Sequence, residues 1–437
     1  MAYILEYATF VKGFSRTAKF YLLSSGLTAL AQGVAGVVMN LYLVRMGLGE
    51  SFLGALASYS SLAGAIFALP AGRASDRYGR RLALLASGVV GVAATLAQVI
   101  RPIPEVLIPA TFIAGAAFTV TMVTGGPLLV EASGDRERTH LFGFQSALVL
   151  GLMVVGSSVG GYLPKVFGAL YAVDAGSVVS LRATLYAGLA LYLLSLIPLL
   201  SMREEPRAAE ATSTGEPPGV GAGAMSIAPR GRTPSWLRLS DPELVRKLLL
   251  PQALVSLGAG LIVPLQNVFM DRYLRASPVQ IGIVFGLTAA VTGIGSLAAP
   301  LMARRLGKIR AVTACQLASL PFMAMMGLSP RFWVYSAASL VRSSLMNLAS
   351  PLITSFCLEV VSSRERATVS SLINMFWSLG WAISAWAGGW VMQHVSYTLP
   401  YGLALVFYAP SILLFYHYFK GYEASIRSRG DTSRLYV

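Results

Sequence analysis

The sequence predicts an all-α, multi-pass membrane protein with twelve transmembrane helices in two related six-helix bundles. Three observations support this fold class: an apolar composition, twelve separate apolar segments, and a repeat that relates the second half of the chain to the first. Of the 437 residues, 55% are hydrophobic and only 12% are charged, which is more apolar and less charged than soluble domains usually are. The lipid bilayer is therefore the expected main solvent of this chain.

Twelve segments are long and apolar enough to cross the hydrocarbon core. A helix needs about 20 mostly apolar residues to span it, because lipid offers no hydrogen-bond partners to the backbone. The predicted spans are 20–44, 51–72, 82–100, 105–130, 140–163, 182–201, 248–270, 279–303, 310–328, 332–359, 368–392 and 398–419.

A segment rich in Pro, Gly, Ala, Ser and Glu separates the sixth and seventh spans. Such a composition cannot bury enough apolar surface to fold alone. Ser240 and Glu243 have the spacing of a capping box at the start of the seventh helix, and Pro251 and Pro264 are expected to bend that helix. The expected organisation is an N-terminal six-helix bundle at 1–201, a cytoplasmic linker at 202–240 and a C-terminal six-helix bundle at 241–437.

The basic residues predict the orientation of the chain. If both termini are cytoplasmic, 26 of the 34 lysines and arginines lie in the tails and loops on the cytoplasmic side, and only seven lie on the other side. The positive-inside rule then places both termini in the cytoplasm, and we expect a cell membrane (plasma or inner membrane) location. The net charge of +15 comes with no nucleic-acid-binding signature, so no nucleic-acid partner is expected.

An internal repeat relates the two halves at an offset of 228 residues. Glu131 recurs as Glu359, and the charged triplet 136–138 recurs as 364–366. Four charged matches in a chain this poor in charge are difficult to ascribe to chance. Two parallel six-helix repeats are typical of transporters in which one half rocks against the other. The glycine pairs at the same offset are Gly54 and Gly282, Gly79 and Gly307, Gly160 and Gly388, and Gly161 and Gly389.

The loop between the second and third spans resembles the signature loop of the major facilitator superfamily, and the twelve spans and midpoint linker agree with that family. The loop reads Gly72-Arg73-Ala74-Ser75-Asp76-Arg77-Tyr78-Gly79-Arg80-Arg81. In the family it latches the cytoplasmic ends of the two halves. Gly72 and Gly79 would permit a tight turn, and Asp76 would accept hydrogen bonds from basic residues and helix N-termini. The residues assigned to this latch are Gly72, Asp76, Arg77, Gly79, Arg80, Arg81, Glu131, Arg138, Glu359 and Arg366.

The family patterns are incomplete in two places. Arg304 stands where the repeat would place a second copy of Asp76. In the fifth span, segment 156–161 has the frame of the motif found in drug antiporters, but Ser157 replaces its proline. The resemblance to drug exporters therefore rests on a partial motif. A basic turn that only sets membrane topology is the alternative to a latch.

Arg342 is expected near the middle of the bilayer. It lies eleven residues past Arg331 on the tenth helix, or roughly 16 Å inward in a core about 30 Å thick. A guanidinium there needs water, polar side chains or an anion; it either faces a substrate cavity or ties its helix to neighbouring carbonyls and hydroxyls. No carboxylate or histidine is expected at mid-depth. By resemblance, helices 1, 4, 7 and 10 line the cavity, and the candidate residues are Arg342, Asn347, Gln32, Asn40, Gln266, Asn267, Asn374, Trp377 and Trp381.

The favoured function is a secondary active transporter that exports small organic or amphipathic molecules by alternating access. The first alternative keeps the fold but makes the cargo an organic anion or lipid-like solute bound through Arg342. The second is a membrane-embedded enzyme or a receptor. The sequence disfavours it, because no catalytic constellation and no signalling domain can be identified. We expect no enzyme activity, cofactor or metal. The expected partners are the small-molecule substrate, the lipid bilayer and a coupling proton or other ion, and the protein is expected to be a monomer.

Overall fold

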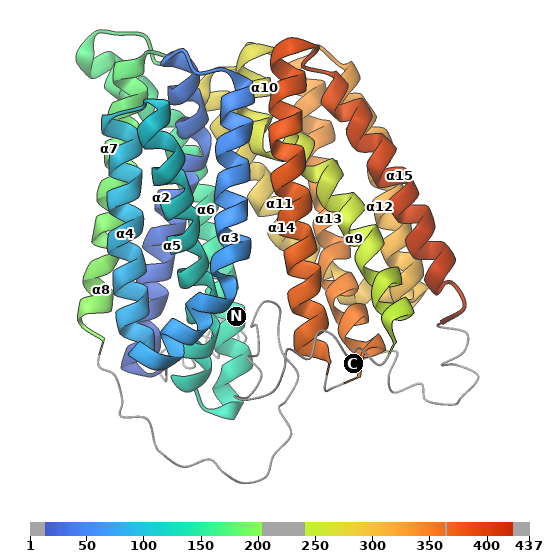
Figure 1. Ribbon diagram of the computed structural model, residues 1–437. Helices are drawn as coiled ribbons and strands as arrows, with labels where there is room; N and C mark the ends of the chain where they lie inside the picture. The colour runs from blue at the N-terminus through green and yellow to red at the C-terminus, as the bar shows by residue number, and fades with distance from the viewer. Residues whose placement is uncertain (1–13, 203–240, 363–364, 423–437) are drawn as a thin grey trace, which may run out of the picture.

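The computed structural model describes residues 14–202, 241–362 and 365–422, and these ranges form helices without strands (Figure 1). All twelve predicted spans are present. The sixth consists of α7 and α8, and the seventh of α9, a 3-10 turn and α10. The first half contains α2 (Arg16–Arg45), α3 (Glu50–Tyr78), α4 (Arg80–Ile100), α5 (Pro104–Glu131), α6 (Asp135–Tyr171), α7 (Val178–Leu194) and α8 (Leu196–Leu200). The second contains α9 (Pro242–Ile262), η2 (Val263–Leu265), α10 (Gln266–Arg272), α11 (Pro278–Leu306), α12 (Lys308–Leu328), α13 (Phe332–Val360), α14 (Arg366–His394) and α15 (Leu399–Phe419).

Length and hydropathy support a membrane location for these helices. Within the described ranges, nine spans are long and apolar enough to cross a membrane. The helix α11 adds a shorter apolar stretch, Pro278–Gly293, and α13 and α14 are 29 residues long each. The prediction of an all-α multi-pass membrane protein is therefore confirmed.

Single glycines connect consecutive helices where the sequence predicted a longer loop. Gly79 has φ +95° and directly joins α3 to α4, and Gly307 has φ +84° and joins α11 to α12. Only glycine adopts such angles without steric cost. The turn expected at Gly72 is wrong, because Gly72 is buried inside α3, which continues to Tyr78. One left-handed residue is enough to reverse the chain here.

The seventh span differs from its prediction at its start. Asp241, not Ser240, caps α9, and its carboxylate accepts a hydrogen bond from the Leu244 amide at 2.9 Å. Ser240 lies outside the described residues. Glu243 pairs with Lys247 instead of reaching back to the cap.

Pro264 interrupts the seventh span, as its missing N–H leads one to expect. It lies in the 3-10 turn between α9 and α10. The Val268 amide, which would normally bond to the Pro264 carbonyl, donates to the Asn267 side chain instead, at 3.0 Å. The Pro264 carbonyl is thereby available to another helix.

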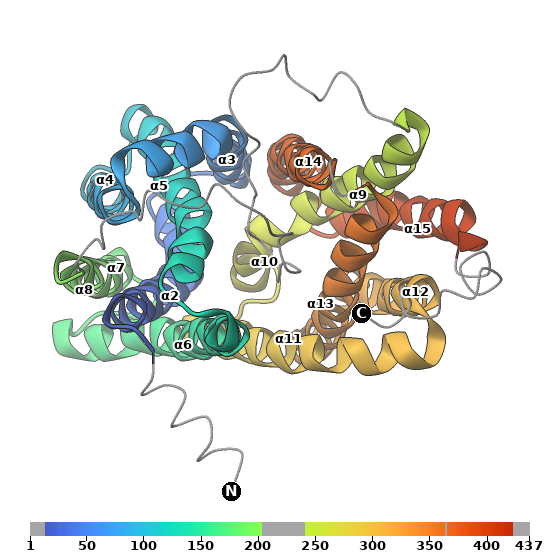
Figure 2. The ribbon, with the colours of Figure 1, turned by 90° about the horizontal axis from the view of Figure 1, so that it is seen from below.

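The repeat predicted from the sequence is visible as two equivalent contacts between the halves. The helix α3 lies beside α14, and α6 lies beside α11 (Figures 1 and 2). A Cβ added to Gly282 would lie 2.6 Å from the Ser157 carbonyl and 2.7 Å from Gly161 Cα. A Cβ added to Gly389 would lie 3.1 Å from Gly54 Cα. Both crossings therefore bring the two backbones together through glycines related by the offset of 228, which is closer than larger residues allow.

Among the described residues, the hydrophobic core is continuous between the two halves at one end of the molecule only. We call the end that carries Arg45, Asp271 and Tyr397 the Arg45 end, and the opposite end, which carries Arg80 and Lys308, the Arg80 end. At the Arg45 end, one buried cluster combines residues of both halves; it includes Leu41, Leu53, Phe269, Tyr335 and Tyr401. At the Arg80 end, each half has a cluster of its own: one around Tyr21, Leu84, Leu129 and Leu141, and one around Ile309, Leu352 and Phe356.

Candidate functional site

An ion pair joins the two halves at the Arg45 end. The Arg45 guanidinium, at the end of α2, donates from Nη1 and Nη2 to the two carboxylate oxygens of Asp271 in α10, at 2.8 and 2.7 Å. The Asp271 side chain is only 5% exposed, whereas the Arg45 side chain is 33% exposed. Two parallel charge-assisted hydrogen bonds are strong and fix orientation. Arg45 and Asp271 were not among the predicted site residues.

Two predicted cavity residues meet in the same interface. Asn40 Nδ2 donates to Asn267 Oδ1 at 3.0 Å and to the Pro264 carbonyl at 2.9 Å. In return, Asn267 Nδ2 donates to the carbonyls of Gly36 and Val37 at 3.3 and 3.2 Å. Because Asn267 is only 2% exposed, the expectation that it lines a cavity is wrong for this state. Both amides instead connect α2 to the interrupted seventh span.

A third polar contact closes the other side of this interface. The Tyr397 hydroxyl donates to the Glu50 carboxylate at 2.6 Å, and the Ser51 amide donates to Gln393 Oε1 at 2.9 Å. Burial, together with the hydrogen bond to Glu50, raises the pKa of Tyr397 to about 12. The phenol is therefore protonated at physiological pH and remains a donor. We refer to the contacts Arg45–Asp271, Asn40–Asn267, Glu50–Tyr397 and Ser51–Gln393 as the Arg45 gate.

Several predicted latch residues come together at the Arg80 end. The Arg80 guanidinium contacts the Asp76 carboxylate at 2.6 Å, the Ser75 hydroxyl at 2.9 Å and the Glu131 carboxylate at 3.2 Å. This network links the junction of α3 and α4 to the end of α5. Its repeat in the second half is the pair of Lys308 and Glu359, which links α12 to α13. Lys308 was not predicted as a latch residue, although it is the position equivalent to Arg80 in the second repeat.

The remaining latch residues have mainly local contacts. Arg81 donates to the carbonyls of Leu199 and Leu200, at 3.2 and 2.6 Å, and so stabilises the end of α8. Arg366 Nε donates to the Leu358 carbonyl at 2.9 Å. Arg77 is exposed, with its guanidinium 5.4 Å from the Tyr78 ring centre. Arg138 is half-buried in the first turn of α6. Favourable charge at helix C-termini explains the first two contacts.

Arg342 is buried in the second half, where it ties α13 to a hydroxyl of α15, the second of the two arrangements expected from the sequence; its exposure to a substrate cavity stays a prediction. It is 7% exposed. Its Nη2 donates to the Tyr408 hydroxyl of α15 at 3.0 Å, and its guanidinium lies 5.4 Å from the centre of the Tyr408 ring. The Nε–H is buried and has no acceptor among the described residues. This is an unusual arrangement, because buried donors are nearly always paired.

The other predicted cavity residues of the second half contact their own helix or a neighbouring one. Gln266 donates to Ser339 at 2.9 Å. Trp377 and Trp381 stack with ring centres 6.4 Å apart and pack against the shared core cluster. Asn374 is exposed and donates to the Ser370 carbonyl of its own helix. The half-buried Asn347 donates to the Ser343 carbonyl at 2.8 Å and to the Thr292 hydroxyl at 3.4 Å.

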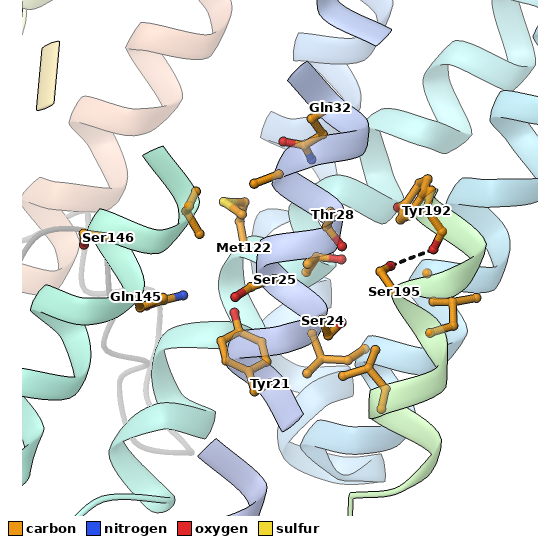
Figure 3. A pocket seen from close by; sticks show the side chains of 17 residues that line it. Tyr21, Ser24, Ser25, Thr28, Gln32, Met122, Gln145, Ser146, Tyr192 and Ser195 are labelled. Carbon is orange, nitrogen blue, oxygen red and sulfur yellow. Dashed lines mark hydrogen bonds between the residues drawn. The ribbon is translucent and has the colours of Figure 1, made fainter. Parts of the chain in front are cut away.

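A pocket of about 260 Å³ lies within the first half, and Gln32 is the predicted cavity residue that lines it. Side chains of α2, α4, α5, α6, α7 and α8 and of Ser195, between the last two, form its walls. Figure 3 shows Tyr21, Ser25 and Gln32 on α2, with Gln145 on one side and Tyr192 on the other. The sequence analysis missed the hydroxyl residues, because serine and threonine are common in membrane helices without a ligand-binding role. The polar lining residues are Tyr21, Ser24, Ser25, Thr28, Gln32, Thr121, Gln145, Ser146, Tyr192 and Ser195.

Two six-helix halves that meet at one end of a membrane bundle are typical of membrane transporters. The profile described as Major Facilitator Superfamily matches residues 21–250 and 248–433. The chain belongs to the major facilitator superfamily.

Known proteins of related sequence or fold are transporters. The maltose permease of Geobacillus stearothermophilus is 27% identical over 165 residues, which is 37% of this chain and 39% of that protein; the match thus spans about two fifths of this relative. A bacterial homologue of the human lysosomal transporter Spinster, in an inward-facing and unoccupied conformation, has a TM-score of 0.66 at 16% identity and covers 91% of this chain and 97% of its own. The nucleoside transporter NupG has a TM-score of 0.67 at 14% identity, with 92% and 98% covered. At these identities the two structures support the fold alone.

Proposed function

We propose that this protein is a secondary active transporter that exports small organic or amphipathic molecules by alternating access. The distribution of the hydrophobic core supports this proposal. One cluster combines residues of both halves at the Arg45 end, and each half has a separate cluster at the Arg80 end. In alternating access, a central site opens to one side at a time as the halves rock. The state described here has the Arg45 end closed.

The contacts between the halves are suited to such a motion. The glycine crossings of α3 with α14 and of α6 with α11 bring two backbones into close contact, and such contacts are suited to a rocking motion of one half on the other. The Arg45 gate consists of polar contacts, which must break when that end opens. Each gives up hydrogen bonds that water can replace, so the cost of opening is moderate.

The proposed export direction is compatible with the closed Arg45 end and the predicted orientation. We propose that the Arg80 end faces the cytoplasm in the cell membrane, because most basic residues lie at that side. A solute would then enter the closed-gate state from the cytoplasm and leave when the Arg45 gate opens. The linker at 202–240 would lie in the cytoplasm between two six-helix domains. One chain contains both halves, which supports a monomeric transporter.

Proteoliposomes containing the purified protein test this proposal. We expect counterflow of a transported solute, and a pH-sensitive dye inside the vesicles determines whether the proton is the coupling ion. Impermeant thiol reagents applied to whole cells should label cysteines placed in the loop at 172–176 and should not label cysteines placed in 203–240. Labelling of both loops from the same side would contradict the twelve-span topology.

Transport of an organic anion is the second candidate, and the buried Nε–H of Arg342 supports it. An anion that entered between α13 and α15, within the second half, would accept this hydrogen bond. Arg182 is a matched control, because it donates to the Tyr42 hydroxyl at 3.0 and 2.9 Å and lies 5.6 Å from that ring. If the candidate is right, Arg342→Gln abolishes anion transport while Arg182→Gln retains it. Equal transport by both variants would exclude it.

A further inference from the structure

We propose that the pocket in the first half binds a small uncharged solute with several hydroxyl groups, of the size of a monosaccharide. This inference rests on the proposed transport function and names its substrate class. It places the main recognition groups on α2 and its neighbours in the first half, at a distance from Arg342.

The lining carries uncharged polar groups set within a mainly apolar surface. Hydroxyls and two carboxamides provide the polar groups, and the lining contains no Asp, Glu, Lys, Arg or His. A charged solute would lose its hydration in this pocket and find no opposite charge, which is costly. A neutral solute with hydroxyls meets groups that both donate and accept. The chemistry of the walls therefore selects against ions.

Some of these polar groups have no protein partner. Ser25 donates to the Leu22 carbonyl, and Ser195 donates to the Tyr192 carbonyl. In contrast, the side chains of Ser24, Thr28 and Gln32 make no hydrogen bond within the described part of the chain. Ser24 is only 5% exposed. Since buried polar groups are nearly always satisfied, the Ser24 hydroxyl lacks an expected partner, and the half-buried Thr28 and exposed Gln32 side chains are likewise available to a bound solute.

The size and the apolar walls limit the class further. Pockets for drug-sized ligands usually measure about 300–1,000 Å³, and this one is about 260 Å³. Leu84, Val149 and Leu196 provide apolar surface between the polar groups. Alternating polar and apolar surface fits a sugar ring, which has hydroxyls at its edge and C–H groups on its faces. The exposed side chains of Met122 and Ser146 lie at its rim.

Binding to the purified full-length protein tests the charge selection. The probes are D-glucose, D-xylose and myo-inositol, compared with D-glucuronate and D-glucosamine, which add one negative or one positive charge to the same ring. Thermal unfolding at increasing probe concentration yields the affinity, because a ligand that binds the folded state raises its stability. We expect at least one neutral probe to bind, and its charged analogues to bind at least tenfold more weakly. Absence of stabilisation by all three neutral probes, or equal affinity for the charged ones, would overturn the proposal.

Matched substitutions test the location. Thr28→Val and Gln32→Leu remove hydrogen-bonding groups without large changes in shape, and each should weaken binding of the neutral probe about threefold to tenfold. Thr95→Val is the control: Thr95 is on α4, outside the pocket lining, and its hydroxyl donates to the Gly91 carbonyl of its own helix at 2.8 Å. It should leave the affinity unchanged. Unchanged affinity in both pocket variants would place the site elsewhere and refute the inference.

Measuring transport as well as binding distinguishes failure of the proposed binding site from failure of the proposed transport function. If a neutral probe binds with the predicted dependence on Thr28 and Gln32 but does not cross the membrane of proteoliposomes, the site stands and the transport function fails. If a solute is transported at equal rates by wild type, Thr28→Val and Gln32→Leu, the transport function stands and this pocket is not its binding site.

Discussion

Breaking the ion pair between Arg45 and Asp271 should shift the protein toward a state that is open at the Arg45 end. The pair makes two charge-assisted hydrogen bonds at 2.8 and 2.7 Å, and the Asp271 side chain is almost fully buried. Hydrogen bonds to charged groups contribute about 1.5–3 kcal/mol each to stability. We take about 2 kcal/mol for the loss caused by Asp271→Asn, since an amide retains one of the two acceptors.

This free energy corresponds to a change in population that can be measured. A loss of about 2 kcal/mol multiplies the ratio of open to closed molecules roughly 30-fold. An open state populated at about 1% would then rise to roughly 20%. Arg45→Gln should have a larger effect than Asp271→Asn, because it leaves a carboxylate buried without its partner, whereas the freed Arg45 can reach water.

Spin labels at the Arg45 end can report this shift. Leu170 at the end of α6 is 70% exposed and Leu328 at the end of α12 is 81% exposed, so labels at these positions should disturb little. The native Cys315 and Cys357 are buried and would be replaced by alanine. Double electron–electron resonance should show a second, longer distance, and the fraction of molecules with this distance should be larger in each variant than in the wild type. In the double variant the two effects should not add, because both remove the same pair. Additive effects, or an unchanged distance distribution in both single variants, would refute the role of this pair as a gate.

Three further predictions follow from the other contacts. Gly282→Ala should abolish transport or lower the thermal unfolding temperature, because its methyl group would lie 2.6 Å from a backbone carbonyl, whereas Gly151→Ala, with nothing within 4 Å, should behave as wild type in both assays. Asp76→Asn should fold normally and transport poorly, since it weakens the ion pair with Arg80; transport at the wild-type rate in proteoliposomes would exclude a latch. The Glu50–Tyr397 bond should be fully present below pH 10, the ordinary phenol pKa, and should be lost as pH rises through about 12. An ultraviolet titration that compares wild type with Tyr397→Phe should therefore show one tyrosine that ionises near pH 12; one that ionises near pH 10 would contradict the buried contact.

The membrane spans and the repeat were predictable from the sequence because lipid imposes strong requirements. A span must be about 20 residues long and must satisfy its own backbone, so the predicted ends differ from the observed ones by only a few residues in most helices. The largest difference is in α6, which continues to Tyr171 instead of ending at 163. The glycines of the repeat were found from their offset alone. Only the structure shows that these glycines lie at the two crossings between the halves.

The roles of the polar residues could not be predicted in the same way. Asn40 and Asn267 are polar residues in apolar spans, which is compatible with either a cavity or a helix contact. The partner of Arg342 is Tyr408, which lies 66 residues away and has no charge to mark it. Serine and threonine are ambiguous as well, because their hydroxyls can bond to a carbonyl of their own helix; Ser25 does so and Thr28 does not. Only the packing of helices distinguishes these cases.

Alternating access of two rocking halves is tested most directly by measuring one spin-label distance at each end of the molecule. One pair of spin labels at Leu170 and Leu328 reports the Arg45 end. A second pair at Tyr78 and Leu306, which are 59% and 44% exposed at the ends of α3 and α11, reports the Arg80 end. When Asp271→Asn weakens the Arg45 gate, the account predicts that the first distance lengthens and the second shortens in the same fraction of molecules. A longer first distance with an unchanged or longer second distance would show local opening or loosening of the bundle, and would contradict the account.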